Sequence, residues 1–161
     1  MTKFLLHFAA IAASLTLLTS CFGTEDDDPN YEDYRLKCEQ FLADNAKREG
    51  VTVTTSGLQY EIVYPGNEDG KKPEPGAMVK CHYTGYFIDG RVFDSSYLSG
   101  APATFRLSTV IKGWQEGLQL MKEGAKYRFV IPYQLGYGDQ PYSTIPPYST
   151  LIFEVELLEI L

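Results

Sequence analysis

The spacing of apolar residues along the chain changes from helical to alternating. Residues 31–48 read YEDYRLKCEQFLADNAKR, and Tyr34, Cys38 and Phe41 recur there at steps of three and four. That period is typical of an amphipathic helix. We therefore predict a helix over residues 31–48, within an N-terminal helical extension that occupies residues 31–50.

Beyond this extension, apolar and polar residues alternate with a period of two, which is typical of β-strands. In residues 150–160, Phe153 and Val155 alternate with Glu154 and Glu156, as in an antiparallel strand with one buried face. Strands are predicted over residues 57–64, 78–87, 91–94, 103–107, 126–132 and 150–160.

One helical pattern interrupts the strands. Trp114, Leu118 and Met121 are spaced i, i+4 and i+7, so they form one apolar stripe, and Gly117 on that face permits close packing. Five to six antiparallel strands can bury one face by wrapping around such a helix. The predicted fold class is α+β: a curved antiparallel sheet around one short helix, preceded by the N-terminal helical extension.

One long segment before the last predicted strand has neither period. Residues 133–149 read YQLGYGDQPYSTIPPYS and are rich in Tyr, Gly and Pro. A loop of this length in a compact domain is usually functional, and the alternative is a surface loop that proline stiffens.

The first 20 residues are predicted to be a signal segment rather than part of the fold. Their apolar run is short and interrupted, unlike a membrane-spanning helix. Leu-Thr-Ser-Cys at 18–21 resembles the processing site of bacterial lipoproteins, which implies cleavage before Cys21 and lipidation of that cysteine. An ordinary secretory signal is the alternative. Residues 21–30 contain four consecutive acidic residues and are predicted to be a solvated tether.

The formal net charge of −7 at pH 7 limits the kinds of partner that the chain can bind. No basic stripe is available to neutralise phosphates, so nucleic acid is not an expected partner. Membrane attachment would rest on acyl chains at Cys21 rather than on attraction to anionic lipid. The helix over 31–48 has too few apolar positions for a long dimerising coiled coil, so a monomer is expected.

Few residues are available for metal, nucleophilic or cofactor chemistry. His82 is the only histidine outside the signal segment, which excludes a multi-histidine metal site and a Ser-His-Asp triad. The sequence contains no phosphate loop or dinucleotide fingerprint, so neither a cofactor nor a metal is expected. Cys38 and Cys81 allow two interpretations: the disulfide of an exported protein, or two buried thiols.

What remains is a set of apolar and aromatic residues at strand ends and at the start of the helix that contains Trp114. Asp94 directly follows one of these residues, Phe93. Each residue alone fits a core, but together they indicate an apolar pocket with few polar groups. The set is Tyr83, Phe93, Val110, Ile111, Trp114, Tyr137 and Phe153.

Four stretches of the chain are distinctive when taken together: VKCHYTGYFIDGRVFDSS, VIKGWQEGLQLMKEGAKYRFVIP, GYGD followed by IPP, and TLIFEVELLEI. These stretches resemble the FKBP family of peptidyl-prolyl cis-trans isomerases. They occur in the family's order, so residues 52–161 are expected to form an isomerase domain. The family fold is a curved antiparallel sheet around one short helix, which agrees with the hydrophobic pattern.

The resemblance implies roles for single residues. Trp114 matches the pocket floor under the proline ring, and Asp94 matches the polar group at the pocket edge. The N–H of Ile111 and the hydroxyl of Tyr137 match hydrogen-bond donors to the bound chain. The residues that fall on pocket positions are Tyr83, Phe93, Asp94, Val110, Ile111, Trp114, Tyr137, Ile145 and Phe153, with Ala103 as a further substrate-contacting position.

The implied function is acceleration of X–Pro isomerisation in exported proteins, with proline-containing polypeptides as substrates. The alternative is a module or chaperone that binds proline segments in the same pocket without turnover, and a third reading is a structural surface lipoprotein. Ser99 stands where members often carry an arginine, and Ala103 replaces a common pocket phenylalanine, so the affinity for macrolide inhibitors stays open. Lipidation would place the protein at the bacterial outer membrane, either in the periplasm or exposed at the cell surface.

Overall fold

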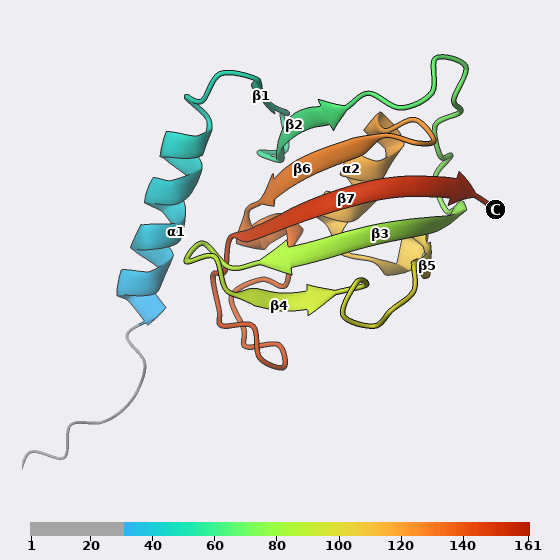
Figure 1. Cartoon of the computed structure of the whole chain (residues 1–161). Helices are drawn as coiled ribbons and strands as arrows, with labels where there is room; N and C mark the ends of the chain where they lie inside the picture. The colour runs from blue at the N-terminus through green and yellow to red at the C-terminus, as the bar shows by residue number, and fades with distance from the viewer. Residues whose placement is uncertain (1–30) are drawn as a thin grey trace, which may run out of the picture.

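The structure, a computed structural model, describes residues 31–161 (Figure 1). The predicted signal segment 1–20, Cys21 and the tether 21–30 lie outside the described residues. The elements in chain order are α1 (Tyr31–Asn45), β1 (Val51–Val53), β2 (Gln59–Tyr64), β3 (Met78–Tyr86), β4 (Val92–Ser95), β5 (Ala103–Arg106), α2 (Lys112–Leu120), β6 (Lys126–Ile131) and β7 (Leu151–Ile160).

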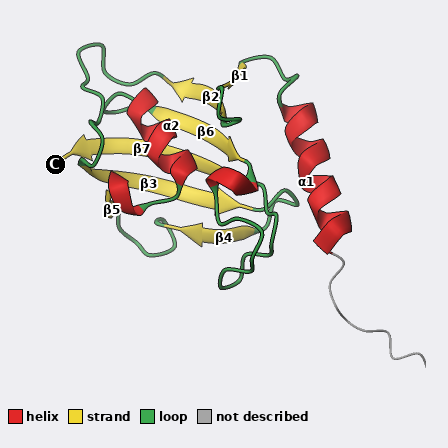
Figure 2. Cartoon of the chain, turned by 180° about the vertical axis from the view of Figure 1, so that it is seen from behind, coloured by secondary structure: helices red, strands yellow, loops and turns green. Residues whose placement is uncertain are grey.

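The seven strands of this region form one antiparallel sheet. Its order is β1-β2-β6-β7-β3-β4, and β5 pairs with β3 in addition. The longest strand, β7, therefore lies between β6 and β3 in the middle of the sheet. Figure 2 shows α2 crossing one face of the sheet, so the main core lies between them. This arrangement confirms the predicted α+β class.

The predicted strands match the structure to within two residues at each end, and two other elements differ more. The sheet has an additional edge strand, β1, whose three residues are too few to show alternation. The helix α1 ends at Asn45 rather than at residue 48. The amides of Lys47 and Arg48 instead bond to carbonyls three residues back, as in a turn.

A glycine lets α2 approach the sheet closely. A β-carbon on Gly117 would lie 2.7 Å from Cε1 of Phe129, which is shorter than carbon atoms in contact allow. A β-carbon on Gly113 would likewise lie 2.6 Å from Cγ2 of Ile131. Leu118 is fully buried on the same face. The stripe predicted for this helix therefore faces the sheet, and the two glycines set the spacing between helix and sheet.

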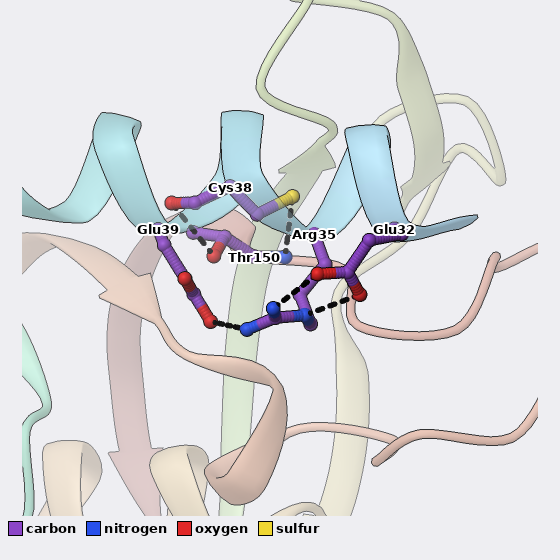
Figure 3. A network of polar contacts seen from close by, with 5 residues as sticks. All are labelled: Glu32, Arg35, Cys38, Glu39 and Thr150. Atoms are coloured by element: carbon purple, nitrogen blue, oxygen red, sulfur yellow. Dashed lines mark hydrogen bonds and ion pairs between the residues drawn. The ribbon is translucent and has the colours of Figure 1, made fainter. Parts of the chain in front are cut away.

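The N-terminal helix packs at the end of the sheet where β7 begins (Figure 1). Cys38 is buried, and its sulfur accepts a hydrogen bond from the N–H of Thr150 at 3.4 Å. The hydroxyl of Thr150 donates to the carbonyl of Cys38 at 3.5 Å. Figure 3 shows this pair beside Arg35, which bonds to Glu32 and Glu39 along the helix. Because Thr150 follows the long loop directly, α1 holds the point where that loop enters the sheet.

The last residue of α1 adds a buried polar contact with the sheet. Asn45 is buried, and its amide donates to Oε1 of Gln59 on β2 at 2.7 Å. The side-chain oxygen of Asn45, Oδ1, accepts hydrogen bonds from Arg128 on β6 at 3.3 Å and from Arg48 at 3.0 Å. A buried amide left without partners costs about 1–3 kcal/mol, so these bonds fix the position of α1 on the sheet.

Cys38 and Cys81 are both buried, and both are free thiols. Of the two interpretations of these residues, the structure therefore has the buried thiols and not the disulfide. Burial raises the pKa of Cys81 to about 12, so little of its reactive thiolate is present at neutral pH.

We expect neither thiol to react with a chromogenic disulfide reagent while the chain is folded. Titration at mildly alkaline pH should reveal Cys38 and Cys81 only after guanidinium chloride is added, because both side chains are buried. A Cys21→Ser variant removes the third cysteine and serves as the control. Rapid reaction of either remaining thiol in the native chain would contradict this prediction.

Candidate active site

A cavity of about 270 Å³ is lined by residues from the start of α2, from strands of the sheet and from the long loop before β7. Aromatic and aliphatic side chains form most of its wall, and one carboxylate lies among them. The lining residues are Tyr83, Asp94, Phe105, Thr109, Val110, Ile111, Trp114, Tyr137, Tyr142 and Phe153.

Trp114 lies in the first turn of α2 and is only 4% exposed. The rings of Tyr83, Phe105 and Phe153 meet its indole edge-on, with centroids 5.2 to 5.3 Å away. Edge-to-face packing at this distance is favourable, and it holds the indole in one orientation. The cavity therefore has a rigid aromatic base.

The indole N–H of Trp114 is the one buried side-chain donor without a hydrogen-bond partner in residues 31–161. Leaving such a donor unpaired costs about 1–3 kcal/mol. Buried unsatisfied groups of this kind are rare in folded proteins and call for an explanation. A ring placed to form a binding surface, rather than to maximise stability, provides one.

The turn before α2 brings two backbone positions to the cavity wall. Ile111 occupies the N-cap position, and its carbonyl accepts from the amides of Trp114 and Gln115. The side chain of Gln115 also donates to the carbonyl of Val110 at 2.7 Å. These bonds fix Val110 and Ile111 beside the indole.

The polar side of the cavity centres on Asp94. The hydroxyl of Tyr83 donates to Oδ2 of Asp94 at 2.6 Å, between neighbouring strands β3 and β4. Burial raises the pKa of Tyr83, and the hydrogen bond to Asp94 and its negative charge raise that pKa further. Tyr83 therefore stays protonated as a donor. Ser96 fixes the backbone of Tyr83, because its hydroxyl accepts a hydrogen bond from the N–H of Tyr83 at 2.9 Å.

The long loop contributes two stacked tyrosines. The rings of Tyr137 and Tyr142 lie nearly parallel, 4.5 Å apart, with an interplanar angle of 17°. Tyr142 and Ile145 exchange backbone hydrogen bonds of 3.0 and 2.9 Å across a two-residue turn, in which Ser143 has a φ of 53°. Burial raises the pKa of Tyr137, with smaller contributions from Tyr142 and Asp94.

The structure brings seven of the sequence-predicted residues to the cavity and leaves three outside its lining. Phe93 packs behind Phe153, with centroids 5.5 Å apart. Ala103 lies opposite Cys81 at the start of β5, and Ile145 is buried at the end of the turn that begins at Tyr142. The residues at the cavity are Tyr83, Asp94, Val110, Ile111, Trp114, Tyr137 and Phe153.

Sequence reasoning missed three lining residues: Phe105, Thr109 and Tyr142. Phe105 is two positions from Ala103 on the same strand, so strand alternation could have suggested it. Thr109 belongs to a 3₁₀ turn (Leu107–Thr109), and Tyr142 to a loop without periodicity. Nothing in the local pattern marks these two.

Groups that could hold a metal ion are missing from residues 31–161, where no cluster of three His, Cys, Asp or Glu side chains occurs. Neither helix of the same region is long and apolar enough to cross a membrane.

Family models match most of the chain. Residues 69–158 match the model described as FKBP-type peptidyl-prolyl cis-trans isomerase. Residues 22–62 match the domain amino terminal to FKBP-type peptidyl-prolyl isomerase. The FKBP-type peptidyl-prolyl cis-trans isomerase FkpA of Aeromonas hydrophila is 48% identical over 148 residues, which cover 92% of this chain and 53% of that protein.

Two further proteins are similar to this chain over most of its length. The outer membrane protein MIP of Legionella longbeachae is 42% identical over 130 residues, or 80% of this chain and 55% of that protein. The crystal structure of FkpA from Escherichia coli matches with a TM-score of 0.77 and 43% identity, over 80% of this chain and 60% of that one. The chain spans about half the length of the curated relatives that it matches. It belongs to the FKBP-type peptidyl-prolyl cis-trans isomerase family.

Proposed function

We propose that this chain accelerates cis-trans isomerisation of X–Pro bonds in exported proteins by holding the proline over Trp114. The observation that carries the proposal is the shape of the cavity. Its base is one indole fixed by three edge-on rings, and its one carboxylate, Asp94, is bonded to the hydroxyl of Tyr83. A pyrrolidine ring is compact, apolar and small enough for a cavity of about 270 Å³.

Isomerisation of an X–Pro bond needs few chemical groups from the protein. Rotation about an X–Pro bond has a barrier of about 20 kcal/mol, because amide resonance must be broken. The twisted transition state has lost that resonance and with it much of its charge separation. An apolar base that holds the proline while the preceding carbonyl turns therefore binds the twisted form better than either planar form.

Each group of cavity residues has a proposed part in this step. Trp114 supports the proline ring, and Tyr83, Phe153 and Val110 border it. The N–H of Ile111 and the hydroxyl of Tyr137 are proposed donors to the bound chain. Asp94 lies at the polar edge, Phe93 packs on the ring of Phe153, and Ala103 and Ile145 are proposed further contacts to the substrate.

The proposal predicts faster refolding of a test protein whose slow phase is X–Pro isomerisation. The rate should rise in proportion to the concentration of the chain, and a macrolide that fills the cavity should abolish the increase. Measurable peptide binding together with an unchanged slow phase would instead support a non-catalytic binding module.

We further propose that the chain is a monomer attached to the outer membrane by lipid at Cys21, on its periplasmic side or at the cell surface. The support is the sequence at 18–21 and the similarity to a relative named as an outer membrane protein. Incorporation of labelled palmitate that disappears in a Cys21→Ser variant tests the lipid. Unchanged labelling in that variant would overturn it.

A further inference from the structure

Charge is unevenly distributed around the cavity. Asp94 is the only charged side chain among its ten lining residues. The side chain of Asp94 is exposed at the rim, and it takes part in no ion pair of the described region. Its side-chain partner is the neutral hydroxyl of Tyr83. The rim therefore carries a negative charge that the protein itself does not neutralise.

The loop that follows Asp94 supplies no cation. Residues 95–102 read SSYLSGAP and contain no basic side chain. The hydroxyl of Ser99 is used instead on the carbonyl of Ser95, at 3.4 Å. The formal charge of −7 for the whole chain adds a negative field around the site.

Tyrosine rings line the same cavity as this carboxylate. One face of the Tyr142 ring stacks on Tyr137, and the side chain is still 57% exposed. The turn that pairs Tyr142 with Ile145 fixes the backbone at this position, and the exposed ring lines the cavity. A carboxylate close to tyrosine faces attracts an ammonium or guanidinium group both by charge and by cation–π contact.

We propose that this rim, formed by Asp94, Tyr83, Tyr137 and Tyr142, selects polypeptides with a lysine or arginine next to the proline. The inference rests on the proposed function, because it takes the proline to lie on Trp114. It names the class of substrate: basic segments are preferred, and acidic segments are disfavoured.

The test uses peptides that differ only in the residue before or after one proline: Lys, Gln or Glu. Isomerisation is followed by NMR exchange, and affinity by the fluorescence of Trp114, the only tryptophan in the chain. One series of peptides varies the residue before the proline, and a second series varies the residue after it. At low ionic strength, kcat/KM and affinity should be about fivefold higher for the Lys peptide than for the Glu peptide in at least one series. At about 1 M salt the ratio should approach one, because the charges are then screened.

Asp94→Asn should bring the ratio of Lys to Glu peptides close to one at low salt. Glu74→Gln changes the net charge equally at an exposed position away from the cavity and should leave the ratio intact. Tyr142→Ala should lower the ratio in part. Equal values for Lys and Glu peptides, in both series, would overturn the inference while leaving the proposed function standing. Absence of turnover with every peptide would overturn the isomerase proposal, and the affinities would still test the rim.

Discussion

Replacement of Trp114 by leucine is expected to lower kcat/KM for X–Pro isomerisation by about 10- to 100-fold, equivalent to about 1.4–2.7 kcal/mol of transition-state stabilisation. Leucine keeps the base apolar but removes the flat plate that three rings hold in place. The measurement is kcat/KM by NMR exchange on a single Xaa-Pro peptide.

The stability of this variant should fall less than is usual for a lost core tryptophan. Its substitution removes aromatic contacts, but it also removes the buried N–H that has no partner. Trp114→Phe, which keeps an aromatic plate, should retain most of the activity.

Leu118→Ala is the matched control, because Leu118 shares the stripe with Trp114 but does not line the cavity. It should cost about 2–5 kcal/mol in the free energy of unfolding. Its kcat/KM, measured on folded protein at low temperature, should change little. A folded Trp114→Leu variant with full activity would remove Trp114 from the proposed mechanism.

Replacement of Gly117 by alanine should destabilise the fold, although alanine is the better helix former by about 1 kcal/mol. The added methyl group meets the Phe129 ring at 2.7 Å, and that ring is fully buried. Overpacking of this kind costs about 1–3 kcal/mol, so we expect a net loss in urea unfolding. Because α2 must move away from the sheet, Trp114 should shift and activity should fall as well.

A double-mutant cycle identifies the cause. Phe129→Leu makes room on β6, so Gly117→Ala should cost less in that background than in the parent. Lys112→Ala, at an exposed position of the same helix, should be close to neutral. Equal costs of Gly117→Ala in both backgrounds would show that the Phe129 ring is not what excludes a side chain there.

The sequence predicts those parts of the fold whose residues repeat with a fixed period. The stripe through Trp114 and Leu118 identified α2, and alternation identified every strand except β1, which is too short to alternate. Contacts between segments distant in sequence left no such pattern. Asn45 is polar, so its burial against Gln59 depends on where α1 packs, and spacing along the helix cannot reveal it.

The candidate site was likewise predicted only in part from the sequence. Resemblance and strand phase placed seven predicted residues at the cavity, but Tyr142 reaches it through the turn that pairs it with Ile145. Phe105 lines the cavity where Ala103 was expected, since the larger side chain two residues along the strand fills the space beside Trp114. Such choices depend on side-chain volume and loop geometry rather than on periodicity.

The position of β7 in the middle of the sheet has a consequence for synthesis of the chain. This strand follows all the others in sequence, yet β6 and β3 contact each other only through it. A nascent chain that stops before residue 151 therefore holds two separate groups of strands, neither of which can close the core. Closure of the sheet must therefore wait until β7 has been made, so the last eleven residues of the chain decide when the core can form.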